Sequence, residues 1–282
     1  MIPDFDPKKT RRAVRRGVLR TALTSALALA VVAVMLIGGL RLLQTRGDRE
    51  ERMEKVLGTA LQIAKPAYHL DIEPCCDVGP LSMSLRVSAQ PIRAIGAFNV
   101  GGGSTYEVRQ NFFGRVEELP WAQLGNTDLT TMLANVGGTL QRRENIRKVL
   151  ARLPQDMNAL AVVELAQPMA DQAFRDFLVQ AGTGAERVAY EVRTGSVPIT
   201  WDFLEETALS GFRAWVGELQ DHDEPNLRRF DLDLARLRKA AKDGLAYAFV
   251  TDENVADLRK LIEDPRVRTV RLADLAFDLE RP

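Results

Sequence analysis

The sequence TALTSALALAVVAVMLIGGL, from Thr21 to Leu40, decides the architecture of this chain. It runs for 20 residues without a charge, between Arg20 and Arg41. A helix that crosses the ~30 Å hydrocarbon core of a bilayer needs about 20 mostly apolar residues, and it satisfies its own backbone hydrogen bonds. The stretch therefore predicts one transmembrane helix, which we assign to residues 21–43.

The charges around this span predict its orientation. Two acidic residues and seven basic residues precede the span, which gives that segment a net charge of +5. After the span, acidic and basic residues alternate and nearly cancel. By the positive-inside rule, we expect a single-pass protein of the cell membrane, with a cytoplasmic N-terminus and an extracytoplasmic C-terminal region. The basic residues are Lys8, Lys9, Arg11, Arg12, Arg15, Arg16 and Arg20.

A cleaved signal peptide is the alternative interpretation of the same stretch. The apolar run is longer than the usual h-region of about 7–15 residues. Ala28-Leu29-Ala30 matches the small-x-small cleavage pattern, but it lies inside the run and is not followed by a polar mature start. A retained anchor is therefore favoured.

Charge and cysteine spacing argue against a nucleic-acid partner and against a zinc site. The chain has 38 basic and 38 acidic residues, so the part after the basic tail carries a net negative charge. We expect no nucleic-acid partner, because no positive field would attract phosphates. The adjacent Cys75 and Cys76 lack the spacing of a zinc site. Their state is left open between free thiols in a loop, a strained ring and an intermolecular disulfide.

The region after the span begins with a predicted helical stalk over residues 44–65, ended by Pro66. Its apolar stripe faces either the outer domain or a second copy of the chain, so a homodimer is left open. The stripe consists of Met53, Val56, Leu57, Ala60, Leu61 and Ala64.

A β-rich segment follows the stalk. Residues 81–89 and 106–112 alternate between apolar and polar side chains, as half-buried strands do. Residues 92–100 form an apolar run between them, and GGGS at 101–104 predicts a turn. Residues 129–153 have helical periodicity, with a break at Gly137 and Gly138.

The C-terminal part contains a repeated strand–helix–strand pattern. The first copy covers 159–166, 169–180 and 187–193, and the second covers 245–250, 253–263 and 267–276. Two βαβ units of this kind predict a ferredoxin-like sandwich. Two further helices, at about 207–220 and 230–242, form an insertion between the copies.

The predicted fold class is therefore α+β, with one N-terminal transmembrane helix. The predicted parts are a basic cytoplasmic tail (1–20), the span (21–43), the stalk (44–65), a β-rich subdomain with its following helices (66–153) and the C-terminal α+β domain (154–282).

No catalytic motif is apparent. Neither of the two histidines, His69 and His222, belongs to a motif that pairs a nucleophile with a base and its orienting residue. Neither has the spacing of a metal-ligand motif. The cluster from Asp221 to Glu224 could hold a hard cation weakly, but a loop between helices explains it as well. We therefore expect neither an enzyme nor a cofactor or metal site.

Several stretches together resemble the membrane-anchored sigma-factor regulators of bacteria, which are anti-sigma proteins. These are RRAVRRGVLRTAL at the entry to the anchor, VRQNFFGRVEELPW, AVVELAQPMADQAF, and LAYAFVTDENVADLRKL as the late repeat. The chain lacks the HxxxCxxC zinc motif of one large anti-sigma class. Its tail of about twenty residues is also too short to fold alone.

The resemblance implies a function. A cytoplasmic sigma factor, or a bridging membrane protein, would contact Arg11, Arg12, Arg15 and Arg16, and the outer domain would sense envelope conditions or bind an unknown extracytoplasmic partner. The basic tail also suits anionic membrane lipid. The alternative function is an anchored binding or scaffold protein with no sigma-factor role.

Overall fold

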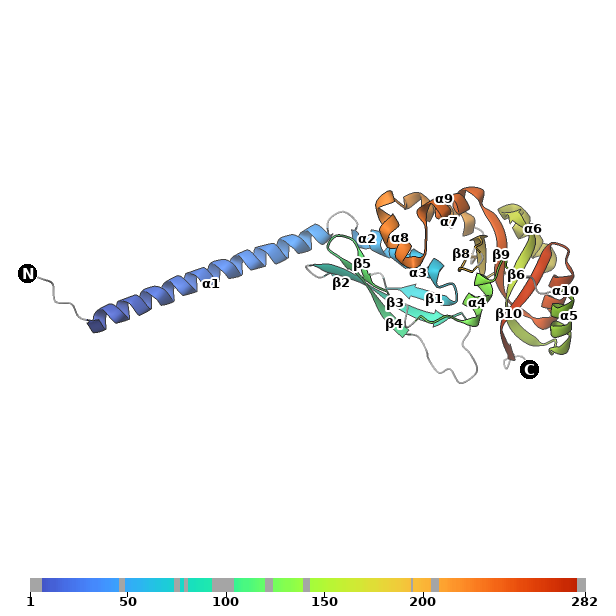
Figure 1. Ribbon diagram of the computed structural model, residues 1–282, viewed down its shortest axis with the longest axis horizontal. Coiled ribbons are helices and arrows are strands. Elements are labelled where there is room, and N and C mark those ends of the chain that lie inside the picture. Colours follow the sequence, from blue (N-terminus) through green and yellow to red (C-terminus); the bar gives the residue numbers. More distant parts are fainter. Residues whose placement is uncertain are drawn as a thin grey trace, which may run out of the picture.

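A computed structural model describes residues 7–45, 49–73, 77–78, 81–92, 104–119, 124–138, 143–193, 195–203 and 208–277. This part of the chain mixes helices with two antiparallel sheets (Figure 1).

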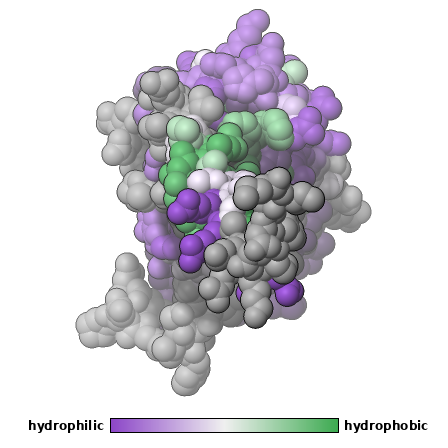
Figure 2. All heavy atoms as spheres, turned by 90° about the vertical axis from the view of Figure 1, so that its left-hand side faces the viewer, coloured by the Kyte–Doolittle hydropathy of each residue, from purple (hydrophilic) through white to green (hydrophobic). Residues whose placement is uncertain are grey.

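Helix α1 (Pro7–Thr45) is one uninterrupted helix that projects away from the rest of the molecule (Figure 1). Its window from Val14 to Gly39 is long and apolar enough to span a membrane, and none of it is buried against the protein. In Figure 2, the green apolar residues of this helix stand in front of a body whose coloured surface is largely hydrophilic. The predicted apolar helix is confirmed, and it extends beyond the assigned 21–43 to Pro7 on one side and to Thr45 on the other.

The segment after α1 packs its apolar side into the body. It comprises α2 (Arg49–Met53), a π-helical turn η1 (Glu54–Gly58) and α3 (Thr59–Ala64). Five members of the predicted stripe belong to the main hydrophobic core, with at most 5% of each exposed, and Ala64 is partly buried against it. The sequence leaves two alternatives open for the stripe, the outer domain or a second copy of the chain. In the structure the stripe packs against the outer domain.

The first sheet follows α3. Its strand order is β1-β3-β4-β5, β2 also pairs with β3, and all pairs are antiparallel. The strands predicted at 81–89 and 106–112 correspond to β3 and β4. The apolar run 92–100 and the GGGS turn lie almost wholly outside the described residues. The strands are β1 (Tyr68–Ile72), β2 (Asp77–Val78), β3 (Ser82–Pro91), β4 (Ser104–Asn111) and β5 (Val116–Glu118).

Two helices lead to the second sheet. Helix α4 (Asp128–Ala134) begins at Thr127, whose hydroxyl accepts a hydrogen bond from the Thr130 amide. The chain leaves α4 through Gly137 in the left-handed region (φ 76°), and α5 (Arg143–Arg152) follows. The interruption predicted in this helical stretch is confirmed.

The second sheet has the strand order β10-β6-β9-β7-β8, with every neighbouring pair antiparallel. Helix α6 (Asp171–Ala181) joins β6 to β7, and α10 (Val255–Glu263) joins β9 to β10. Strand β8 was not predicted from the sequence. The strands are β6 (Met157–Ala170), β7 (Arg187–Glu191), β8 (Ile199–Asp202), β9 (Leu245–Asn254) and β10 (Val267–Phe277).

The insertion between β8 and β9 is more broken than the predicted pair of helices. The second predicted helix starts later than expected, because the Asp233 carboxylate caps α9 by accepting from the Arg236 amide. The insertion contains α7 (Ala208–Glu218), η2 (Asp221–Asp223), α8 (Glu224–Leu227), η3 (Arg228–Phe230) and α9 (Leu234–Asp243).

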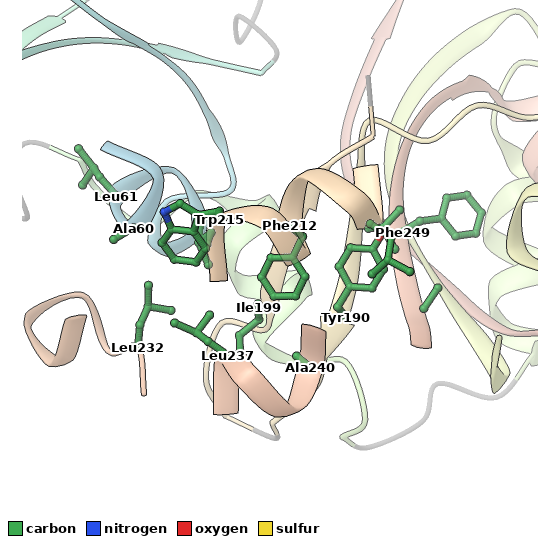
Figure 3. Packing of buried hydrophobic residues seen from close by; sticks show 14 of the residues in the cluster. Ala60, Leu61, Tyr190, Ile199, Phe212, Trp215, Leu232, Leu237, Ala240 and Phe249 are labelled. Atoms are coloured by element: carbon green, nitrogen blue, oxygen red, sulfur yellow. The ribbon is translucent and has the colours of Figure 1, made fainter. Parts of the chain in front are cut away.

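Aromatic packing joins this insertion to the sheet edge and to α3. The rings of Tyr190 on β7 and Phe212 on α7 are stacked, with centroids 5.4 Å apart. Trp215 lies beside Ala60 and Leu61 of α3 (Figure 3), and its indole nitrogen donates to the Lys55 carbonyl at 2.9 Å. The insertion therefore connects the repeat domain to the segment that leaves α1.

Both faces of the second sheet are covered. On one face, Phe249 of β9 packs edge to face against Phe174 and Phe177 of α6. On the other, Val162 and Val250 share a cluster with residues of α4. Buried side chains of the first sheet belong to the same main core as those of α2, α3 and α6, so the two sheets share one interior.

Candidate functional site

The N-terminal part of α1 carries the arginines singled out from the sequence. Arg11, Arg12, Arg15 and Arg16 all lie on regular helix, at spacings of one, three and four residues. At 3.6 residues per turn, these positions fall within an arc of about 140° of the helix surface. Arg11, Arg15 and Arg16 are exposed. The structure describes only the backbone of Arg12, which gives that residue a position within this arc.

In the described part of the chain, Arg11, Arg15 and Arg16 of this basic face have no ion-pair partner. Like charges four residues apart on a helix destabilise it by about 0.2–0.5 kcal/mol per pair. An acidic protein surface or anionic headgroups would relieve that repulsion, so the face is suited to binding an anionic partner.

The transition from this basic face to the apolar stretch is made within the same helix. The hydroxyl of Thr21 donates to the Gly17 carbonyl at 3.0 Å, and that of Thr24 donates to the Arg20 carbonyl at 3.0 Å. These bonds satisfy the hydroxyl donors without a partner from outside, as a helix in lipid requires. The basic face and the apolar stretch belong to one continuous helix.

At its other end, α1 is followed by a junction of α2, the β4–β5 turn and η2. Arg52 of α2 forms an ion pair with Asp223 of η2, with 2.6 Å between Nη2 and Oδ2. Arg49 donates to the Phe112 carbonyl in the turn at 2.9 Å. A cavity of about 280 Å³ lies between these elements, and His222 and Asn226 contribute to its lining.

The acidic cluster around this cavity is structural. The Asp223 carboxylate accepts from Arg52 and from the Gln220 amide, and the Glu224 carboxylate accepts from the Leu234 amide at 2.9 Å. Among the described residues, no group of three or more His, Cys, Asp or Glu side chains is placed to hold a metal ion. His69 lies on β1, away from His222 at the junction. Cys75 and Cys76 lie outside the described part.

Sequence reasoning did not identify the buried charged side chain of Arg187 on β7. Its side chain is 1% exposed and forms an ion pair with Asp202 of β8, with 2.9 Å between Nη2 and Oδ1. It also donates to the carbonyls of Gln62 and Tyr68, at 3.3 and 3.0 Å. Burial lowers the pKa of Arg187, while Asp202 acts in the opposite direction. The group links β7, β8, α3 and β1.

Part of the basic cluster on α5 is engaged as well. Arg143 donates to the carbonyls of Asp264 and Val267. Arg147 stays exposed and forms an ion pair with Glu263 of α10. These contacts fasten α5 to the last strand–helix unit.

Comparison of the chain with protein-family models, with characterised proteins and with solved structures found no match. The geometry of the site is therefore the basis for a functional assignment.

Proposed function

We propose that this protein is a single-pass regulator of an alternative sigma factor in the cell membrane. In this proposal the N-terminus is cytoplasmic, and the basic face of α1 holds the sigma factor, or a bridging protein, at the membrane. The body senses envelope conditions on the other side. The regulation works by binding and requires no catalysis.

One observation carries the proposal. Helix α1 continues without a break from Pro7 to Thr45, so the arginine face and the apolar window are parts of the same rod. A partner bound to that face is therefore held directly at the bilayer surface. The net charge of +5 on the segment before the span supports the cytoplasmic placement of this end.

We also infer that the second sheet belongs to a ferredoxin-like domain. The order β10-β6-β9-β7 and the antiparallel pairings support this assignment, because α6 and α10 each connect two parallel strands that have one strand of the other repeat between them. Strand β8 and the helices of the insertion are additions to that plan.

The test is a two-hybrid screen of the full-length chain against each sigma factor of the host. We expect binding to one of them. Replacing Arg11, Arg12, Arg15 and Arg16 by Ala should weaken that binding by a factor of about four to several hundred, since four exposed ion pairs contribute about 0.2–1 kcal/mol each.

Two controls make the result interpretable. A variant with the same four positions changed to Lys keeps the charge that sets topology, and a reporter fused to the C-terminus verifies the orientation of both variants. Replacing Arg147, Lys148 and Arg152 on α5 by Ala removes basic charge from the body and should leave sigma-factor binding unchanged.

Absence of binding to every sigma factor by the wild-type chain would contradict the regulator assignment. If the body then still captured an envelope protein, the alternative role of an anchored scaffold would replace it.

A further inference from the structure

The turn between β4 and β5 presents an aromatic side chain to solvent. Phe113 at its tip is 84% exposed. The Asn111 side chain holds the turn by accepting hydrogen bonds from the amides of Phe113 and Arg115, at 3.0 and 3.1 Å. Gly114 completes it with φ 78°, a conformation that other residues rarely adopt. The turn is therefore a fixed support for an exposed apolar side chain.

A second exposed apolar residue lies at the same end of the first sheet. Leu81 is 64% exposed and immediately precedes Ser82, which pairs with Asn111. Leu81 is thus placed beside the turn that carries Phe113. The neighbouring Arg115 is exposed and adds a cation to this end. We call Leu81, Phe113 and Arg115 the tip surface.

The tip surface is at the end of the body from which α1 departs. Arg49, the first described residue after α1, donates to the Phe112 carbonyl, and its guanidinium group lies 5.9 Å from the Phe112 ring centre. Helix α1 itself contacts β2, and Figure 1 places that end of the first sheet beside the C-terminal end of α1.

Chain length keeps the tip surface close to the bilayer. Helix α1 extends six residues beyond its apolar window, about 9 Å at 1.5 Å per residue. The four peptide steps from Thr45 to Arg49 add at most about 14 Å. The 26-residue window is about 39 Å long, which exceeds the ~30 Å core, so the helix has spare apolar length with which to tilt or sink.

We propose that the tip surface docks on the phospholipid bilayer that α1 spans. Phe113 and Leu81 enter the interfacial layer, and Arg115 contacts lipid phosphates. Aromatic side chains beside cations are well suited to that layer. The proposal rests on the membrane anchoring in the proposed function and is independent of sigma-factor binding.

The experiment uses tryptophan as a depth probe in the full-length chain, reconstituted in phospholipid nanodiscs. Phe113→Trp and Leu81→Trp are compared in discs of ordinary lipid and discs of lipid brominated on the acyl chains, which quenches tryptophan by contact. Val179→Trp is the matched control, because Val179 is 82% exposed on α6, on the other side of the body from α1 (Figure 1). Wild-type emission is subtracted in each case.

We expect Phe113→Trp and Leu81→Trp to add blue-shifted emission that is lost in brominated discs, while the emission added by Val179→Trp stays unchanged. A response of both tip probes like that of Val179→Trp would overturn the proposal. So would blue-shifted emission that bromine leaves intact, because it would mean contact with protein, such as a second copy. Retention of the wild-type chain in alkali-washed vesicles tests the anchor separately.

Discussion

At the scale of single residues, the buried Arg187 joins four elements of the body, β7, β8, α3 and β1. Its guanidinium group contacts a carboxylate on β8 and two carbonyls that lie more than a hundred residues away along the chain. Sequence reasoning could not have found it, because an arginine in a strand is usually exposed. Its burial is decided by partners that only the folded chain brings together.

We expect Arg187→Met to lower the free energy of unfolding by about 3–5 kcal/mol, because it leaves the Asp202 carboxylate and two carbonyls without their charged donor. Urea unfolding of the full chain in nanodiscs, followed by tryptophan fluorescence, measures this. Arg147→Met is the matched control. It breaks an exposed ion pair with Glu263 and should cost at most about 1 kcal/mol. Equal losses in the two variants would contradict the assigned role of Arg187.

Asp264, which follows α10, makes the stability of the body depend on pH. The hydrogen bond from the Arg266 side chain holds the pKa of Asp264 below its ordinary value. The unfolded chain then binds a proton more readily than the folded one, so this stabilisation is present above about pH 4 and is lost as the pH falls through the lowered pKa.

Asp264→Asn should therefore destabilise the chain at neutral pH, and the difference from wild type should shrink as the pH falls below about 4. Urea midpoints from neutral pH to below about pH 4 measure the difference. A difference that stays constant with pH would mean that the Asp264 carboxylate contributes through its shape and not through its charge.

At the scale of elements, the two copies of the repeat begin their helices differently. The Asn254 side chain caps α10 by accepting from the Asp257 amide at 2.9 Å, whereas Ala170 at the same place before α6 offers no side-chain acceptor. A missing cap costs a helix about 0.5–2 kcal/mol.

We predict opposite effects of changing these two caps. Asn254→Ala should lower the free energy of unfolding by about 1 kcal/mol, and Ala170→Ser should raise it by a similar or smaller amount. Chemical denaturation of the two single variants and of the double variant measures both effects. If Ala170→Ser destabilises the protein, the backbone before α6 does not behave as an ordinary helix cap.

The elements also show which parts of the fold could be predicted from sequence patterns and which could not. Both repeats were found because their buried strands and amphipathic helices have different periods. Strand β8 was missed because its four residues are too few to establish alternation. The basic face of α1 followed directly from residue identity and helical spacing. The exposure of Phe113 could not be predicted, because it depends on where β4 ends and how the Asn111 turn folds.

At the scale of the whole molecule, the segment between α1 and β1 determines what can fold independently. From the sequence alone this segment is predicted to be a helical stalk, because an apolar stripe does not show which surface it packs against. In the structure these side chains fill the core that both sheets share.

A chain of residues 49–282 should consequently fold without α1, and a chain of residues 66–282 should not. The shorter chain lacks two leucines and an isoleucine of the core, and removing one such side chain alone costs about 2–5 kcal/mol, against a typical total stability of about 5–15 kcal/mol. Circular dichroism during thermal unfolding distinguishes the outcomes. A cooperative transition in the shorter chain would show that the α2–α3 segment is dispensable.

The short connection between α1 and Arg49 also sets the distance over which this protein can search for a partner. If α1 anchors the protein in a bilayer as proposed, the body is held within a few peptide lengths of that bilayer and cannot reach as far as a long-tethered domain does. Its encounters are then limited to a thin layer along the membrane, where lateral diffusion replaces diffusion in three dimensions. A partner confined to the same layer meets it at a high effective concentration, so a weak intrinsic affinity is sufficient for binding.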